Sequence, residues 1–210
     1  DMSFHAIREY APGDARRQIH WKSTAKTGRL MVRQFEESLR SRLAVILSLA
    51  QADYASDDEF ELGVSVAASL AAQAVRDGRD LDVVTGAEIP RVVRGRMRSI
   101  ELLTATTPRG LLDGFSRVRS LEHTMPVEEV CRLSVEASDT LSLAFLVCGS
   151  QVSLGRLRQA ALSFSDQTAV VAIVCDEKAH PQRRQFGDLN VLSVGLLGDL
   201  AGLMLRGVQT

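Results

Sequence analysis

Few side chains in this sequence have the types and the spacing that catalysis or metal binding requires. Asp176 and Glu177 form a carboxylate pair directly after an apolar run, and Ser48 and Asp53 follow an earlier run. A hard cation needs several converging oxygen ligands, and these loops supply few. We therefore interpret Asp176 and Glu177 as a solvated turn and helix cap, and we expect no bound metal.

Signatures of nucleophilic catalysis and of phosphate binding are absent from the sequence. The four histidines lack metal-binding spacing, no Gly-x-Ser-x-Gly turn presents a serine, and no glycine-rich run precedes a Lys-Ser or Lys-Thr pair. We therefore expect no catalytic residues and no cofactor. One alternative stays open, a metal- or ligand-binding hydrolase that uses the loops at Ser48, Gly149 and Asp176, because ligands bind where parallel strands end.

The cysteines indicate a reducing compartment. Cys131, Cys148 and Cys175 are far apart and odd in number, which argues against a disulfide framework. Cys148 and Cys175 each end an apolar run, as small buried hydrophobes do. The longest apolar stretch, 191–205, is interrupted by Asp199 and is shorter than the roughly 20 residues of a membrane span. We expect a cytoplasmic location.

The segment 8–37 differs in kind from the rest of the chain. It contains the only tryptophan, alternates cationic with aromatic side chains, and includes two turn signals, Pro12-Gly13 and Thr27-Gly28. Two interpretations stay open: a fixed ion-pair network with Trp21 covering a sheet, or a recognition surface with Trp21 as an amphipathic anchor. The candidate partner-binding or motif residues are Arg8, Tyr10, Pro12, Gly13, Asp14, Arg16, His20, Trp21, Lys22, Gly28, Arg33 and Glu36.

Charge divides the chain in a similar way. The 210 residues have a formal net charge of -1, yet residues 1–42 carry a net +4 and residues 43–210 a net -5. A total this close to zero does not predict a nucleic-acid partner, because that binding needs a surplus of cations facing phosphates. We expect no nucleic-acid partner, although the +4 segment and Trp21 keep this alternative open.

Strand-like and helix-like runs alternate along residues 43–210. Ser56 and Glu59 form a capping box, which predicts a helix from that point to Gly78. A hairpin that turns at Gly95 is predicted over 89–103. The predicted strands are 43–48, 81–85, 141–148, 169–175 and 190–194, and further helices are predicted to begin at Pro108 and Pro126 and to span 153–164 and 198–205.

This alternation predicts an α/β fold, a mostly parallel sheet with helices on both faces. We divide the chain into an N-terminal, turn-rich motif segment, 1–42, that packs on the body, and an α/β domain, 43–210.

The N-terminal segment resembles the hallmark motif of domain-of-unknown-function family fifty-eight. The residues that carry the resemblance are Arg8-Glu-Tyr-Ala-Pro-Gly-Asp14, Arg16, Ile19-His-Trp-Lys22, Ala25, Thr27-Gly-Arg-Leu30, Val32-Arg33 and Phe35-Glu36. The resemblance implies a Rossmann-like, von Willebrand factor A-like domain after the motif and no established enzymatic activity. It also implies membrane-spanning helices upstream, outside this sequence, that would tether the protein to the inner membrane.

The resemblance further implies a MoxR-type AAA+ ATPase as partner and, in some lineages, a transglutaminase-like protein. Domains of the von Willebrand A type often bind a metal through Asp-x-Ser-x-Ser, where this chain has Ser48-x-Ala50-x-Ala52. Thr106 or Thr107 and Asp176 would correspond to the later ligands, so we expect a degenerate metal site. We expect a non-catalytic protein-interaction module of a larger, membrane-anchored protein that acts in complex assembly or remodelling.

Overall fold

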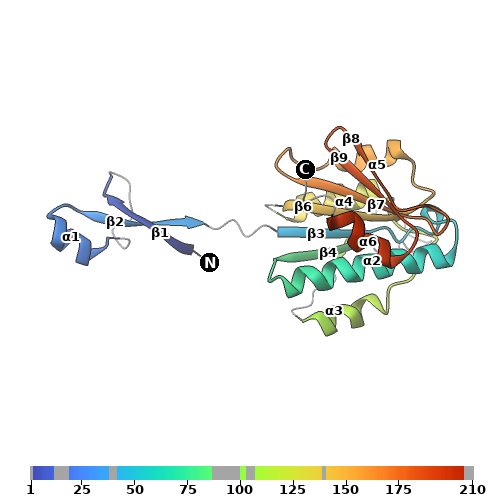
Figure 1. Cartoon of the computed structure of the whole chain (residues 1–210), viewed down its shortest axis with the longest axis horizontal. Helices are drawn as coiled ribbons and strands as arrows, with labels where there is room; N and C mark the ends of the chain where they lie inside the picture. Colours follow the sequence, from blue (N-terminus) through green and yellow to red (C-terminus); the bar gives the residue numbers. More distant parts are fainter. Residues whose placement is uncertain are drawn as a thin grey trace, which may run out of the picture. The chain divides into compact units, whose positions relative to one another are not determined.

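The computed structural model describes residues 2–11, 19–37, 42–86, 100–102, 107–138 and 141–205 (Figure 1). The chain divides into two compact units, Asp1–Arg40 and Ser41–Thr210, which we call the N-terminal unit and the α/β unit. The predicted packing of the first on the second stays a prediction.

The N-terminal unit is a two-stranded antiparallel sheet with one short helix. Strand β1 (Met2–Glu9) pairs with β2 (Met31–Glu37), and helix α1 (Trp21–Thr27) precedes β2. Residues 29–35 alternate in the sequence as a strand does, and β2 lies over most of this range. Neither β1 nor α1 was predicted, and α1 buries none of its residues, so its sequence lacks the apolar periodicity that marks a helix.

The α/β unit is built on a seven-stranded sheet in the order β5-β4-β3-β6-β7-β9-β8. The five central strands run parallel, and the edge strands β5 (Ile100–Leu102) and β8 (Gln182–Phe186) are antiparallel to their neighbours. The parallel strands are β3 (Arg42–Leu47), β4 (Leu81–Gly86), β6 (Leu141–Gly149), β7 (Ala169–Cys175) and β9 (Leu189–Val194). The predicted mostly parallel α/β sheet is confirmed.

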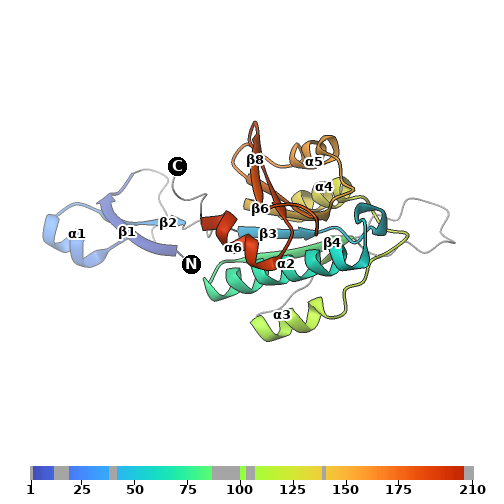
Figure 2. The same cartoon turned by 45° about the vertical axis from the view of Figure 1, so that its right-hand side comes forward.

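Helices cover both faces of this sheet, as the alternation predicted (Figure 2). One core lies under α2 (Asp57–Arg76), α3 (Pro108–Phe115) and α6 (Leu197–Leu205). The other lies under α4 (Val127–Ala137) and α5 (Leu154–Ala161). The central strands therefore bury both faces, which explains why they appear in the sequence as continuous apolar runs.

Three predictions about the elements need correction. Pro126 occupies the N-cap of α4 and not its first turn, and α5 ends at Ala161, three residues before the predicted end. The polar strand β8 was not predicted. It follows β7 directly in the chain, where a helix was expected. Most of the predicted hairpin over 89–103 lies outside the described residues; β5 alone is seen, antiparallel to β4.

The three cysteines are buried and unpaired, and burial was predicted for Cys148 and Cys175. Burial, with a smaller contribution from Glu59, raises the pKa of the Cys175 thiol to about 12, and burial also raises the pKa of Cys131 and Cys148.

The reactivity of these cysteines depends on the thiolate, which is the reactive form. We expect the native thiols to react with dithiobis(nitrobenzoate) only at the rate of unfolding, and all three to react at once in guanidinium; rapid labelling of a native thiol would contradict this.

Within the described ranges, none of the helices combines the length and the apolar character that a bilayer crossing requires.

Candidate functional site

The loop after β3 is a buried polar corner at the carboxyl edge of the sheet. A short 3-10 turn, Gln51–Asp53, folds this loop back, so that the Ser48 hydroxyl donates to Asp53 Oδ2 at 2.6 Å. The Tyr54 hydroxyl donates to the Ser48 carbonyl oxygen at 2.7 Å. Ser48 and Asp53 are each only 2% exposed. The side-chain oxygens of Ser48, Asp53 and Tyr54 are therefore engaged in hydrogen bonds within the loop itself.

Arg156, in the first turn of α5, neutralises this corner. Its Nη1 donates to Asp53 Oδ1 at 2.6 Å, and its Nε and Nη2 donate to the two Glu128 oxygens at 2.6 and 3.0 Å. Burial is the largest single effect and raises the pKa of Glu128, but the hydrogen bond from Arg156, a backbone hydrogen bond and the charge of Arg156 together lower the pKa of that carboxyl. We call Ser48, Asp53, Glu128 and Arg156 the Arg156 network. It ties the β3 loop to the first turns of α4 and α5.

The positions of the expected degenerate metal site do not fit a divalent cation. Ala50 and Ala52 offer no side-chain oxygen, and the carboxylate of Asp53 faces the Arg156 guanidinium. No cluster of three or more metal-ligating side chains exists among the residues that the structure describes. Because a guanidinium already satisfies the one buried carboxylate of this loop, a second cation would be repelled.

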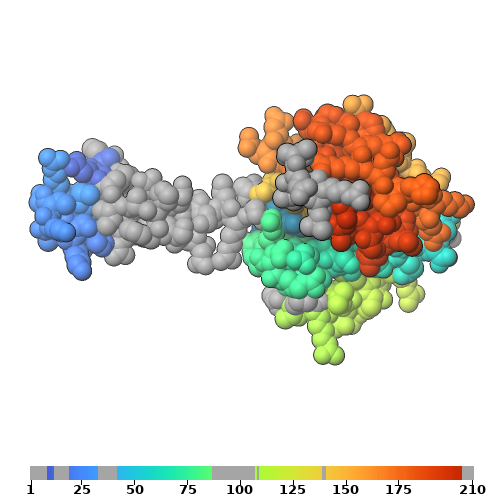
Figure 3. All heavy atoms as spheres, viewed as in Figure 1, coloured from blue at the N-terminus to red at the C-terminus, as the bar shows by residue number. Residues whose placement is uncertain are grey.

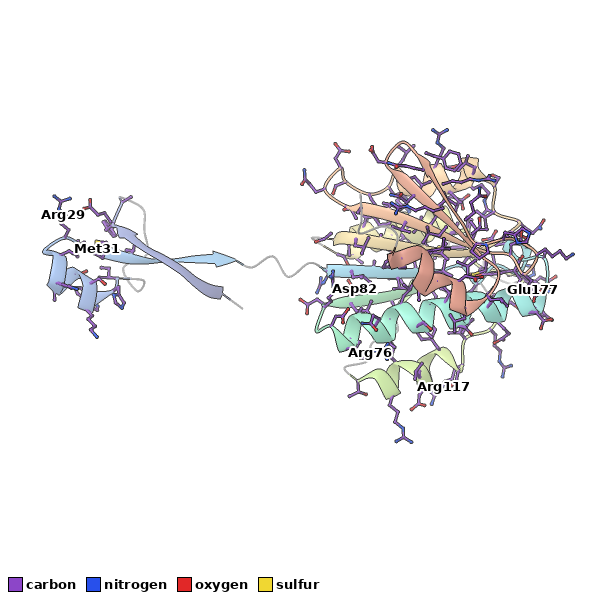
Figure 4. All side chains as sticks on the ribbon, in the orientation of Figure 1. Arg29, Met31, Arg76, Asp82, Arg117 and Glu177 are labelled. Atoms are coloured by element: carbon purple, nitrogen blue, oxygen red, sulfur yellow. The ribbon has the colours of Figure 1, made fainter. Side chains whose placement is uncertain are left out.

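The remaining loop positions have local roles. Asp176 Oδ1 accepts from the Lys178 backbone N–H at 2.9 Å, so Asp176 caps a turn; the predicted helix cap is wrong because β8 follows. Thr107 is the N-cap of α3 and accepts from the Gly110 N–H, whereas Thr106 lies outside the described residues. Glu177 lies at the carboxyl edge in Figure 4.

Glu59 closes the other side of the polar corner. Its N–H donates to Ser56 Oγ at 3.0 Å, as the capping box predicts, but its own carboxylate accepts from the N–H groups of Ala55 at 2.6 Å and Ser150 at 3.2 Å. The second bond joins α2 to the end of β6. The loops at Ser48 and Gly149 therefore lie close together, and hydrogen bonds among their own polar groups and with Glu59 hold them there.

Helix α1 of the N-terminal unit is held by its two ends. At the start, His20 Nδ1 accepts from the Ser23 N–H at 3.3 Å and lies 2.8 Å from the Ser23 hydroxyl. At the end, Gly28 has a φ of 72°, which favours glycine, and its N–H donates to the Thr24 carbonyl oxygen at 2.9 Å. His20 and Gly28 therefore have roles in helix capping, which the sequence motif alone did not show.

Trp21, the first residue of α1, is 68% exposed. The interpretation in which it covers a sheet is wrong for the sheet of its own unit. Lys22 and Lys26 are exposed on the same helix, and Arg29 is paired with Glu9 at 2.6 Å on the surface (Figure 4). We call Trp21, Lys22 and Lys26 the Trp21 surface. An exposed indole on a short helix that also carries two exposed ammonium groups can contact a partner that offers an apolar pocket and acidic groups.

The other motif residues are placed only in part. Arg8 lies on β1 opposite Val32, and Arg33 and Glu36 lie on β2. The Tyr10 backbone N–H donates to the Leu30 carbonyl oxygen at 2.8 Å and extends the pairing beyond β1. The predicted turn residues Pro12, Gly13, Asp14 and Arg16 lie outside the described residues.

Comparisons with known proteins find similarities to parts of this chain. Residues 6–103 match the family described as "Protein of unknown function DUF58". The chain is 34% identical over 73 residues to "Uncharacterized protein YeaD" of Bacillus subtilis (strain 168), a match that covers 35% of this chain and 17% of that protein. A solved structure, "von Willebrand factor type A from Catenulispora acidiphila", aligns at 13% identity and a TM-score of 0.42 over 69% of this chain and 34% of that one.

Proposed function

We propose that this chain, which carries the DUF58 family signature over residues 6–103, is a non-catalytic protein-interaction module whose N-terminal unit binds a MoxR-type AAA+ ATPase. The larger protein would be membrane-anchored and would act in the assembly or remodelling of a complex, with a transglutaminase-like protein as a further partner. The observation that carries the proposal is the exposure of Trp21, 68%, at the start of a capped helix.

The Trp21 surface is suited to binding because it is held in shape before a partner arrives. The caps at His20 and Gly28 fix α1 at both ends, and the Thr24 hydroxyl accepts from the Met31 N–H at 3.0 Å, which joins α1 to β2. A preformed helix loses little conformational entropy on binding. Tryptophan is enriched among the residues that dominate binding energies, so an exposed tryptophan on such a helix is suited to anchor a partner.

The absence of a catalytic role is supported by the α/β unit. The Ser48 hydroxyl donates to Asp53, Asp53 also accepts from Arg156, and Asp176 caps its own turn. None of these groups is presented to a substrate in this arrangement. Binding at the Trp21 surface would therefore account for the motif without any chemistry at the carboxyl edge of the sheet.

Replacement of Trp21 by alanine is expected to weaken binding to the MoxR-type ATPase of the same organism by at least about tenfold, because a central aromatic anchor is lost. The dissociation constant is measured by biolayer interferometry, with the chain immobilised and the purified ATPase added at increasing concentrations. Leu112→Ala is the control, since Leu112 is a 51% exposed apolar side chain on α3 of the other unit. Both substitutions should change the free energy of unfolding by no more than about 0.5 kcal/mol.

A charge reversal at Lys22 distinguishes the contribution of the lysines to binding from that of Trp21. Lys22→Glu should also weaken binding, and its effect should shrink as salt is added, because exposed charges are screened. Unchanged affinity in a folded Trp21→Ala variant would refute the assigned surface, and equal losses for Leu112→Ala would show that the effect is not local.

A further inference from the structure

We propose that strand β8 is a docking edge for an extended, acidic segment of a partner protein, which adds to the sheet as a further strand. This surface belongs to the α/β unit and goes beyond the proposed function of Trp21, so each can fail without the other.

Strand β8 ends the described sheet on one side and pairs only with β9 there. Four of its five residues are exposed, and Phe186 is half-buried. Figure 3 shows the orange segment that contains β8 at the surface of the α/β unit. An edge strand presents a row of unpaired N–H and C=O groups, and an extended peptide satisfies these groups by adding alongside.

The face of β8 that turns toward α5 combines a cation with a hollow whose lining is partly apolar and partly polar. Arg184 and Phe186 share this face because alternate residues of a strand point the same way, and Phe186 packs against the core under α4 and α5. Beside Phe186 a hollow of about 710 Å³ extends to the end of α5, where Leu162 is 85% exposed. Phe164 and Leu189 line its apolar part, and the charged residues Arg158, Asp166 and Asp188 also line it. An added strand would place one side chain near Arg184 and another over the hollow.

Charge decides which occupant fits. Strand β8 contains Arg183 and Arg184 and no acidic residue. Arg183 is held on the opposite face, where its Nε and Nη2 donate to Asn190 Oδ1 at 3.3 and 3.0 Å, and Arg184 is exposed. A second copy of this chain would bring four arginines together across the pair, and like charges on facing strands destabilise pairing. A segment with glutamates or aspartates facing Arg184 and an apolar residue facing the hollow is complementary.

The test uses a labelled peptide of about seven residues, Thr-Glu-Thr-Val-Thr-Glu-Thr. In an extended strand its two glutamates and its valine point to the same face. Fluorescence polarisation with the full 210-residue chain should show binding about tenfold tighter than for the same peptide with lysines in place of the glutamates. N-methylation of alternate peptide amides along the pairing edge should abolish binding, because strand addition needs those N–H groups. Amide exchange of β8 should slow when the peptide binds.

Two variants with matched controls locate the site. Arg184→Glu should reverse the preference between the two peptides, whereas Arg117→Glu, just after α3 (Figure 4), should leave it unchanged. Leu162→Asp should weaken binding of the glutamate peptide, and Leu112→Asp should not. Equal binding of the N-methylated peptide would overturn strand addition. Failure of both peptides to bind, with self-association that depends on Arg184, would overturn the acidic partner in favour of a second copy.

Discussion

Replacement of Gly149 by alanine is expected to destabilise the α/β unit by about 3 kcal/mol, because overpacking against atoms that cannot move has costs of this order. A Cβ at this position would lie 2.4 Å from the Asp53 carbonyl oxygen, 2.5 Å from Tyr54 Cδ1 and 2.8 Å from Glu59 Oε2. The Asp53 carbonyl also accepts from the Gln151 N–H at 3.2 Å, which fixes it in place. Thermal unfolding should show a melting temperature lower by roughly 10 °C.

Gly202→Ala is the matched control for this prediction. Gly202 lies inside α6, and a Cβ there would meet nothing within 4 Å. Alanine is favoured over glycine in a helix interior, so this variant should be more stable by about 0.5–1 kcal/mol. If Gly149→Ala were as stable as the original protein, the close packing of the β3 loop against the end of β6 would be wrong.

The sequence predicts the centre of the sheet well and its margins poorly. Strands β3, β6 and β7 are buried on both faces, so their apolar runs stand out against charged flanks. Strand β8 reads Gln-Arg-Arg-Gln-Phe, and all of its residues except Phe186 are exposed. A strand with a single apolar, half-buried side chain leaves no alternating pattern to find. Helix α1 was missed for the same reason, since none of its residues is buried.

The candidate site shows a different limit. The loop at Ser48 and Asp53 could be singled out because it follows an apolar strand, but Arg156 lies 103 residues further along the chain. One local signal did exist. Arg156 stands in the first turn of α5, where the positive end of the helix disfavours a cation. A cation in that place requires nearby carboxylates, and the sequence cannot say which ones the fold brings there.

Replacement of Arg156 by methionine is expected to destabilise the α/β unit by about 3 kcal/mol, since removal of one partner leaves a buried charge uncompensated. Asp53 is 2% exposed and would keep only the Ser48 hydroxyl as a side-chain donor among the contacts of the Arg156 network. The value is at the low end for buried pairs because the Arg156 side chain is 32% exposed. Arg158→Met, on the exposed side of the same helix, is the control and should change stability little.

Acid titration tests the same network through Glu128. Its pKa in the folded protein is lowered from the ordinary 4.5, so the unfolded chain takes up the proton first as the pH falls. The stabilisation from Glu128 is therefore complete above about pH 4.5 and is lost as the pH falls through the lowered pKa. Chemical unfolding at a series of pH values should show this loss in the original protein and a smaller one in Arg156→Met.

A double-mutant cycle separates the ion pair from the packing of the arginine side chain. Glu128→Gln should cost much less in the Arg156→Met background than alone, with an interaction energy of about 1–2 kcal/mol for groups in direct contact. Strictly additive effects would contradict the pairing of Glu128 with Arg156. Coupling would show that the guanidinium holds α4, α5 and the β3 loop together, because Arg156 lies on α5, two of its hydrogen bonds reach Glu128 on α4, and the third reaches Asp53 in the β3 loop. The Arg156 guanidinium would then be the cation that neutralises the buried carboxylates at the carboxyl edge of the sheet.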